Sequence, residues 1–282
     1  MNNHLASSLE SRVISYKSIS GGDISSAYNI KTQNQDYFLK VNGSSNASKM
    51  FSSERAGLNT IAKTNTIATP KIYLQDSYKN ISYILMEYIE SVPPAKHSFK
   101  KLGIQLAKLH QTKADKFGFN QHNFIGSLQQ SNSFHDSWLS FYIEERLIPQ
   151  IDLAITKRLL NQNEVPSNNK MQVVLDNLLK NKTPSLLHGD LWSGNFLIAS
   201  NGTPYLIDPA CYYGHNEVDI AISNLFGGFD SSFYNAYHDI IPKNEHTNAR
   251  IELYQLYYLL VHLNLFGGSY YSSVKHILLK YF

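Results

Sequence analysis

The sequence predicts an α+β fold of two lobes, in which a small antiparallel β-sheet with one helix precedes a larger, mainly α-helical lobe. Three observations predict it. Short β-prone runs separated by turn residues fill the first 88 residues. Apolar residues then recur at spacings of three and four, which indicates helices. One pair of short apolar runs interrupts the helical part and predicts an inserted β-hairpin. The expected lobes are residues 1–88 and 89–282.

The small lobe is predicted to hold five strands and one helix. Three β-prone runs at its start are separated by Gly-rich and Asn/Asp-rich reversals, which is the pattern of antiparallel strands. A helical pattern follows, then a strand opened by Thr69-Pro70 and a nearly all-apolar run typical of a buried strand. The expected ranges are 13–19, 27–32 and 37–41 for the first strands, 52–62 for the helix and 82–88 for the buried strand.

The large lobe begins after the stiff Val92–Pro94 segment. Apolar residues on one face predict a helix over about 99–109 and another that carries Phe134 and Trp138. The apolar runs NFLI and YLID flank an Asn201-Gly202 turn signal, which predicts the hairpin. Further helices are expected over 170–181, 217–225, 231–239, 248–265 and 269–281.

Composition and charge exclude several classes of protein. Hydrophobic residues make up 43% of the 282 residues and charged residues 17%, against about 25% in a typical domain, so disorder and coiled coil do not fit. The net charge of +3 comes without a dense basic block, which argues against nucleic-acid and anionic-membrane binding. The strongest apolar run, 256–266, is far shorter than the roughly 20 residues that span a bilayer, and we interpret it as a buried helix.

The cysteine content and the first residues of the sequence indicate the cellular compartment of the protein. The single cysteine, Cys211, excludes an intrachain disulfide and a zinc site built from four cysteines, and it fits a reducing compartment. The opening residues, MNNHLASSLESR, lack the basic start and apolar centre of a secretory signal. We therefore expect a cytoplasmic protein.

The run HGDLWSGN, residues 188–195, is the strongest indication of chemistry. Asp190 and Asn195 keep the D-x-x-x-x-N spacing that kinases use for a base and a magnesium ligand, and Asp208 follows a strand, where a second metal carboxylate belongs. Phosphoryl transfer needs a carboxylate beside the attacking hydroxyl and oxygen ligands that hold magnesium against the phosphates. We therefore expect Asp190 to be the catalytic base, and Asn195 and Asp208 to be the metal ligands.

Ordinary structural roles compete with these interpretations. A lone aspartate in an HGD tripeptide is commonly a turn residue, but the register of Asp190 with two further oxygen ligands favours the catalytic role. His188 is expected to pack and hydrogen-bond rather than transfer protons. Glu217 and Asp219 begin a predicted helix, so stabilisation of the helix N-terminus explains them as well as substrate contact does.

The segments LLHGDLWSGN and IDPACYYGHNEVDIA resemble the fructosamine kinase (ketosamine 3-kinase) family, within the wider aminoglycoside-phosphotransferase and protein-kinase-like fold. The resemblance covers nearly the whole chain, with GGDIS, FLKV, LMEY, LGIQLAKLH and LFGGF in the family's order, and the Trp192 form of the loop separates this family from most sister kinases. It implies a protein-kinase-like bilobal fold and ATP-dependent phosphorylation of the 3-hydroxyl of a ribulosamine, fructosamine or erythrulosamine. That activity serves deglycation or ketosamine metabolism.

The resemblance also implies roles in nucleotide binding. Lys40 is an isolated charge on an apolar strand, where kinases keep a lysine that holds the α- and β-phosphates, and Glu54 is its natural partner. A solvent-facing Lys40 is the alternative. Gly21 and Gly22 would let the backbone approach the phosphates, although the full G-x-G-x-x-G pattern is absent.

Two further expectations concern adenine and the sugar. Met86, Glu87, Tyr88 and Ile89 are expected to form the hinge whose backbone hydrogen-bonds the adenine edge, and a plain strand end is the alternative. Trp192 lies beside the proposed base, where a flat aromatic ring can pack on a sugar face, and core packing is its alternative.

The expected cofactors are ATP and Mg²⁺, and the expected partner is a small-molecule ketosamine or a glycated lysine in a peptide or protein. No nucleic acid or membrane partner is expected, and the oligomeric state stays open, with a monomer favoured. Two alternatives remain. One is a small-molecule kinase of the same fold that acts on an aminoglycoside, choline or homoserine, and the other is a nucleotide-binding pseudokinase.

Overall fold

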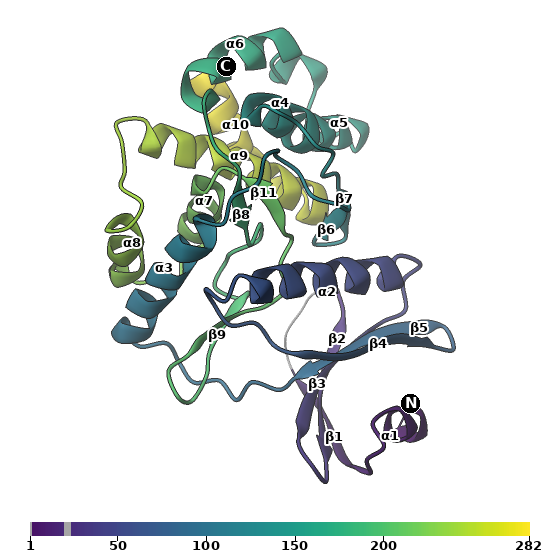
Figure 1. The fold of residues 1–282 in the computed structure, drawn as a ribbon. Helices are drawn as coiled ribbons and strands as arrows, with labels where there is room; N and C mark the ends of the chain where they lie inside the picture. The colour runs from purple at the N-terminus through teal and green to yellow at the C-terminus, as the bar shows by residue number, and fades with distance from the viewer. Residues whose placement is uncertain (1, 20–23) are drawn as a thin grey trace.

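The computed structural model describes residues 2–19 and 24–282, so the predicted phosphate-loop residues Gly21 and Gly22 lie outside the described residues. A twisted antiparallel sheet with strand order β1-β2-β3-β5-β4 lies on one side of the molecule, and a group of helices lies on the other (Figure 1). This arrangement confirms the predicted α+β fold class. The sheet and its two helices are β1 (Val13–Ile19), β2 (Ser26–Thr32), β3 (Asp36–Asn42), β4 (Ile72–Tyr78), β5 (Ile81–Glu87), α1 (Asn2–Ser8) and α2 (Ala47–Lys63).

The alternation of side chains along the strands builds two separate cores in the small lobe. In β5, Ile84 and Met86 point to one face and pack against α2, while Tyr83 and Leu85 point to the other and pack with Leu5 of α1. The sequence does not predict α1, because seven residues with one deeply buried apolar side chain show no helical period. The strand termini agree with the prediction to within a residue or two, whereas α2 begins five residues before its predicted start.

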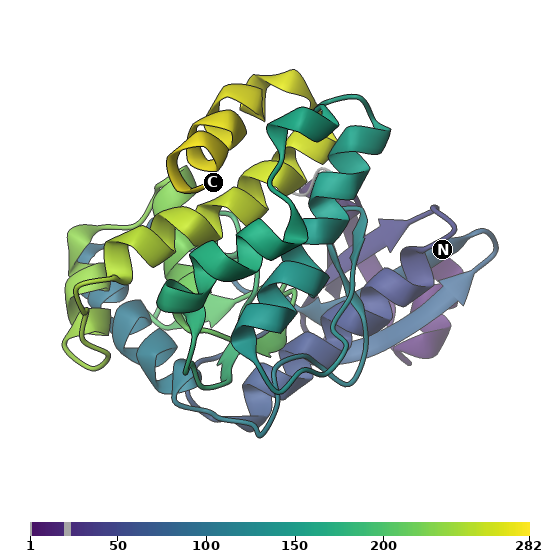
Figure 2. The same ribbon diagram turned by 90° about the horizontal axis from the view of Figure 1, so that it is seen from above.

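The larger group is mainly helical, and its longest helix, α9 (Thr247–Phe266), crosses it with most of its side chains buried (Figure 2). A helix that is apolar all round belongs in a core, which agrees with the interpretation of the apolar run 256–266. The helices are α3 (Lys96–His110), α4 (Trp138–Tyr142), a π-helical turn (Ile143–Leu147), α5 (Ile148–Thr156), α6 (Asn168–Leu179), α7 (Glu217–Phe226), α8 (Ser231–His238), α9 (Thr247–Phe266) and α10 (Tyr271–Tyr281), with 3₁₀ turns at Gln162–Glu164 and Gly268–Tyr270. None of the helices in residues 2–19 and 24–282 has the length and apolar content to cross a bilayer.

The predicted hairpin is present as β9 (Phe196–Ile198) and β10 (Pro204–Leu206). Two further strand pairs were not predicted: β6 (Asn123–Ile125) with β7 (Leu128–Gln130), and β8 (Ser185–Leu187) with β11 (Tyr212–Gly214). Three-residue strands give too short a pattern to recognise, and the β8–β11 pair joins distant parts of the chain. Together β8 and β9 bracket the HGDLWSGN loop, which places it between the helical group and the sheet.

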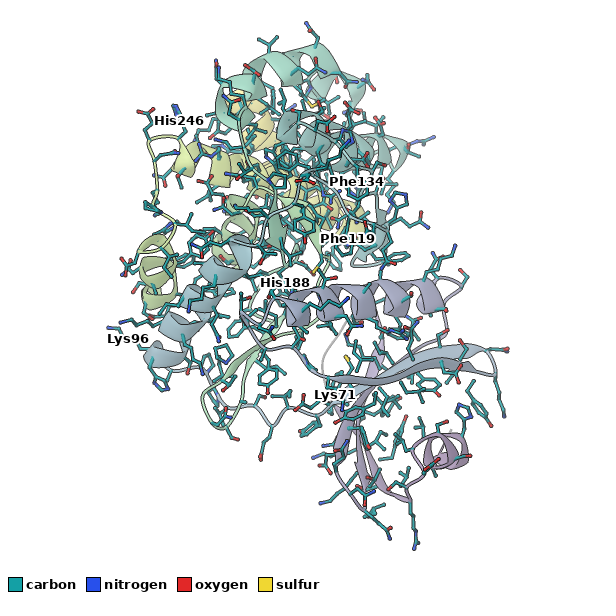
Figure 3. All side chains as sticks on the ribbon, viewed as in Figure 1. Lys71, Lys96, Phe119, Phe134, His188 and His246 are labelled. Atoms are coloured by element: carbon teal, nitrogen blue, oxygen red, sulfur yellow. The ribbon has the colours of Figure 1, made fainter. Side chains whose placement is uncertain are left out.

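One helix assignment was wrong. Phe134 was expected on the buried face of the helix that contains Trp138, but α4 begins only at Trp138 and the Phe134 side chain is 53% exposed (Figure 3). Its spacing of four from Trp138 matches a helix by coincidence, because residues 131–134 have no regular secondary structure. Trp138 itself is fully buried, as predicted.

Candidate active site

A cavity of about 1100 Å³ lies between the sheet and the helical group. Its wall includes side chains of β3, α2, the end of β5, the HGDLWSGN loop and the end of the hairpin. All of the predicted site residues that the structure describes line it: Lys40, Glu54, Met86, Glu87, Tyr88, Ile89, Asp190, Trp192, Asn195 and Asp208. The fold therefore brings together groups that lie more than 160 residues apart in the chain.

Lys40 on β3 joins the two lobes through two carboxylates. Its Nζ donates a hydrogen bond to Oε1 of Glu54 on α2 at 2.8 Å and also contacts Oδ1 of Asp208. Burial alone would lower the pKa of Lys40, but the two carboxylates raise it above its usual value. Burial, with the charge of Asp208 nearby, raises the pKa of Glu54 to about 8. One cation thus faces two carboxylates, and Glu54 is the one that holds a proton more readily.

Asp190 and Asn195 meet across the loop. The Nδ2 amide of Asn195 donates to Oδ2 of Asp190 at 3.0 Å and to the Asp190 backbone oxygen at 2.8 Å. Because the amide nitrogen makes both bonds, the amide oxygen stays available as an oxygen ligand. Burial and the charge of Asp208 raise the pKa of Asp190 to about 7, so this carboxyl group can gain or lose a proton near neutral pH.

Asp208 adopts an unusual backbone conformation. Its φ of 54° lies in the left-handed region, which is uncommon for residues other than glycine and costs about 1–3 kcal/mol. The preceding residue, Ile207, donates its backbone N–H to the Asn195 carbonyl at 3.1 Å, so the hairpin end is tied to the loop. The left-handed turn and this bond together direct the Asp208 carboxylate toward Lys40.

Asp219 of α7 supports the loop from beneath, a role that the sequence analysis did not find. It is fully buried and accepts hydrogen bonds at 2.8 Å from the backbone N–H groups of His188 and Gly189, and at 3.0 Å from Nε2 of His110. Asp219 lies in the first turn of α7, as expected of a helix N-terminal charge, but it does not line the cavity and so is not placed for substrate contact. His188 is fully buried and bonds the Ile207 carbonyl through Nε2 at 2.9 Å, as its predicted structural role requires.

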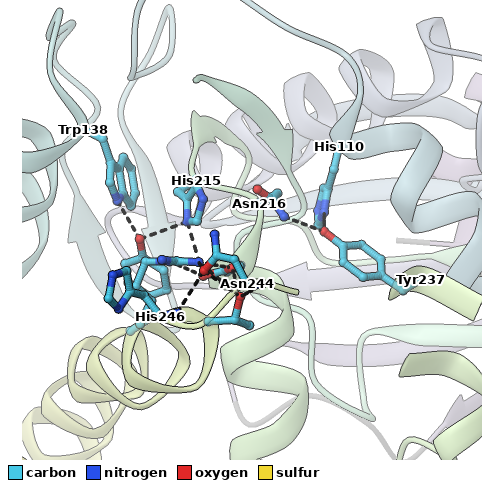
Figure 4. A network of polar contacts seen from close by, with 11 residues as sticks. His110, Trp138, His215, Asn216, Tyr237, Asn244 and His246 are labelled. Carbon is cyan, nitrogen blue, oxygen red and sulfur yellow. Dashed lines mark hydrogen bonds and ion pairs between the residues drawn. The ribbon is translucent and has the colours of Figure 1, made fainter. Parts of the chain in front are cut away.

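A second polar network lies at the N-terminal end of α7, between α7 and α9 (Figure 4). Glu217, at the first position of that helix, accepts two hydrogen bonds from Arg250, each at 2.6 Å, and both side chains are almost fully buried. Asn244 and Thr247 also bond the Arg250 guanidinium, at 3.0 and 3.2 Å. Glu217 therefore anchors α7 to α9 from the first turn of the helix and, like Asp219, does not line the cavity.

Breaking this pair should destabilise the protein. We expect Arg250→Met to lower the free energy of unfolding by about 3–5 kcal/mol, because a buried Glu217 carboxylate is left without its cation. Urea denaturation at pH 7 measures the loss. Lys275→Met is the matched control, since it removes a more exposed partner of Glu164 and should cost about 1 kcal/mol or less. Equal losses in the two variants would contradict the assignment.

Trp192 lines the cavity. Its side chain is 41% exposed, so core packing, the alternative raised from the sequence, is wrong. The indole ring lies over Gly194, where an added Cβ would come within 2.3 Å of the ring. Gly194 thus leaves room for the ring to lie against the loop with one face open to the cavity.

The hinge residues occupy the end of β5 and the segment after it. Met86 and Glu87 are the last two residues of the strand, paired with Phe38 and Tyr37 of β3, and Tyr88 and Ile89 follow it. All four line the cavity at the passage from one lobe to the other. The backbone N–H of Glu87 donates to the Lys71 carbonyl at 2.8 Å, and the role of the four residues in binding adenine stays a prediction.

Several known proteins are similar to this chain over most of its length. The model of the fructosamine kinase family matches residues 1–282. A probable ketoamine kinase of Enterococcus faecium is 42% identical over 261 residues, which covers 92% of each protein. The ketosamine-3-kinase of Mus musculus is 36% identical over 286 residues, again with 92% of each covered.

Solved structures share the same architecture. A crystal structure from Haemophilus somnus 129PT, provisionally assigned as a fructosamine-3-kinase, gives a TM-score of 0.88 at 29% identity over 99% of this chain and 95% of that one. A thermostable variant of aminoglycoside phosphotransferase APH(4)-Ia, in a ternary complex with ADP and hygromycin B, gives a TM-score of 0.66 at 15% identity over 99% and 97% of the two chains. The second likeness shows the fold alone, and it confirms the predicted protein-kinase-like architecture.

Proposed function

This chain belongs to the fructosamine kinase family, and we propose that it transfers the γ-phosphoryl group of ATP to the 3-hydroxyl of a ketosamine with Asp190 as general base. The observation that carries the assignment of roles is the meeting of four groups in one cavity. Asp190, Asn195, Asp208 and Lys40 come from a strand, a loop and a hairpin end, and all of them line the same space. Phosphoryl transfer uses a base, metal ligands and a phosphate-binding cation in this combination.

The nucleotide is proposed to bind between the sheet and the loop. The backbone of the 86–89 segment would hold adenine, and Lys40, braced by Glu54, would bind the α- and β-phosphates. Gly21 and Gly22 lie outside the described residues, and their contact with phosphates stays a prediction. The lysine already lies between two carboxylates, so a bound polyphosphate would compete with Asp208 for it.

Asn195 and Asp208 fit a magnesium ion. The free amide oxygen of Asn195 and the carboxylate of Asp208 are hard oxygen ligands, and Mg²⁺ is commonly bound by one or two such groups together with substrate phosphates. When bound, the ion would neutralise charge that develops on the phosphates. The backbone bond from the Ile207 N–H to the Asn195 carbonyl ties together the two segments that carry these ligands.

Asp190 would act at the acceptor. As the 3-hydroxyl oxygen forms its bond to the γ-phosphorus, its proton passes to the Asp190 carboxylate while the bond from phosphorus to the ADP oxygen breaks. The raised pKa of about 7 makes the carboxylate a stronger base than a solvent-exposed aspartate. Trp192, open to the cavity beside it, is proposed to pack against the face of the sugar.

An acceptor panel tests the proposal. ADP release from ATP and Mg²⁺ is measured with ribulosyl-lysine and fructosyl-lysine and, as controls of other chemistry, with kanamycin, choline and homoserine. We expect turnover with a ketosamine and none above background with the three controls. Turnover of a control instead would favour a small-molecule kinase of the same fold. ATP binding without turnover of any acceptor would favour a pseudokinase.

The natural acceptor is proposed to be a free ketosamine or a glycated lysine of a peptide or protein. A cavity of about 1100 Å³ exceeds the 300 Å³ or so of the smallest ligand pockets, so it can hold a nucleotide and a sugar together. A cytoplasmic location, a monomeric state and the absence of nucleic-acid or membrane partners remain predictions from the sequence.

A further inference from the structure

Four aromatic rings line the cavity on the side of the helical group, and the proposed reaction gives them no role. Phe226 ends α7, His262 and Phe266 lie in the last turns of α9, and Tyr270 lies in the following 3₁₀ turn. His262 is at the centre, with its ring centroid 4.4 Å from that of Phe226, 5.4 Å from that of Phe266 and 5.2 Å from that of Tyr270. We call these four residues the aromatic wall.

The aromatic wall adjoins the loop that carries the proposed base. Gly228, two residues after Phe226, packs so closely on Ser193 that an added Cβ would lie 2.5 Å from the Ser193 Cβ. Its φ of 88° also favours glycine at this point. The end of α7 is thereby held against the residue that follows Trp192, and the wall continues the surface that begins at the indole.

Burial shows that the aromatic wall is not simply part of the core. Phe266 is 55% exposed and the other three members are partly exposed, whereas the aromatic residues of the core, such as Phe141 and Tyr254, are fully buried. Exposed aromatic side chains gathered in a concave site are typical of ligand-binding surfaces. A ligand that contacts Asp190 and extends past Trp192 would then contact these rings.

The central ring is neutral and offers an acceptor. Nδ1 of His262 lies 2.9 Å from the Tyr258 carbonyl, which can only accept, so Nδ1 carries the proton and Nε2 is left with its lone pair. Burial lowers the pKa of His262 below its usual value, which keeps the ring uncharged at neutral pH. The wall therefore presents π faces and one lone pair, and no positive charge of its own.

We propose that the aromatic wall is a subsite for the amine side of the acceptor, binding the protonated secondary amine of the ketosamine and the alkyl chain that it bears. This inference rests on the proposed function. A cation over an aromatic face gains electrostatic attraction from the ring quadrupole, and methylene groups gain by leaving water against the rings. The lone pair of His262 Nε2 can accept a hydrogen bond from the ammonium N–H. The subsite would select ketosamines over free ketoses.

Two acceptors that differ in the positive charge of the amine measure how much this charge contributes to binding. One is the 1-butylamino derivative of the ketose that the acceptor panel selects, and the other is its 1-O-butyl ether, which keeps the sugar and the chain but lacks the cation. We expect wild-type kcat/KM to favour the amine, and Phe266→Leu and Tyr270→Leu each to reduce this preference by roughly threefold to tenfold. Leucine keeps an apolar side chain but removes the aromatic ring, so kcat/KM for the ether should decrease less than kcat/KM for the amine.

Phe134→Leu is the control, because Phe134 has nearly the same exposure as Phe266, 53% against 55%, and does not line the cavity. Phe134→Leu should leave the preference for the amine over the ether unchanged. In all three variants, KM for ATP and the midpoint of thermal unfolding should stay close to the wild-type values. Equal losses for amine and ether, or no preference in the wild type, would overturn the subsite while the kinase activity stands. A wild type that phosphorylates neither acceptor would overturn the proposed function and the subsite with it.

Discussion

Replacing Asp190 by Asn is expected to lower kcat for ketosamine phosphorylation by at least about 10²- to 10⁴-fold, the range associated with loss of a general base. Asparagine keeps the shape of the side chain and its contact with Asn195, but it cannot take the proton of the acceptor hydroxyl. Steady-state ADP release measures the loss, and calorimetric titration with ATP should show near-normal nucleotide binding. An activity loss below tenfold would exclude Asp190 as the base.

The same variant carries a pH test. Burial and the Asp208 charge raise the pKa of Asp190 to about 7, so the protonated and inactive form accumulates as the pH falls below that value. Wild-type kcat/KM should therefore decrease as the pH is lowered from 8 to 6, and the residual activity of Asp190→Asn should lack this decrease. A wild-type profile that is flat over this range would mean that the carboxylate titrates well below neutral pH.

A loss of stability should not account for the lower activity of Asp190→Asn. In the wild type, ionised Asp190 lies near the Asp208 charge in a buried site, so its charge costs stability above pH 7. Asparagine carries no charge, and the variant should be at least as stable as the wild type at pH 8. Thermal unfolding at that pH is the check.

The sequence predicts those parts of the site that depend on short local patterns. Asp190 and Asn195 are five residues apart on one loop, and Lys40 is a single charge on an apolar strand, so each stands out within a few residues. The order of the predicted strands and helices implies that these residues lie close together, and the structure places all of them in one cavity. The α+β class was predicted for the same reason, because strand and helix periods are local.

The parts that could not be predicted depend on contacts between distant segments. Asp219 looks like the start of a helix, and only the fold brings it to the backbone of residues 188 and 189. The sequence predicts a buried helix that contains His262 and Phe266, because within an apolar run no local pattern distinguishes a residue that lines a cavity. The same limit applies to Phe134, whose spacing from Trp138 matched a helix that begins after it.

Replacing Lys40 by Met should have the second large effect, on both activity and stability. We expect kcat/KM for ATP to fall by about 10²- to 10³-fold, the cost typical of removing one group that stabilises charge in the transition state. Removal of the cation also leaves the largely buried Glu54 carboxylate and the partly exposed Asp208 carboxylate facing each other, which should cost less than the about 3–5 kcal/mol typical of breaking a fully buried pair. Initial rates at varied ATP and urea denaturation at pH 8 measure the two effects.

The pH dependence of this stability loss identifies its cause. Without Lys40, the folded-state pKa values of the two carboxylates should lie above their unfolded values, so the folded state binds more protons and regains stability as the pH falls. The difference in free energy of unfolding between wild type and Lys40→Met should therefore shrink from pH 8 to pH 5. Adding Glu54→Gln to the variant should restore much of the stability at pH 8 but none of the activity, since the repulsion disappears while the phosphate-binding cation is still missing. Unchanged ATP kinetics in Lys40→Met would contradict the role of this lysine, whatever its effect on stability.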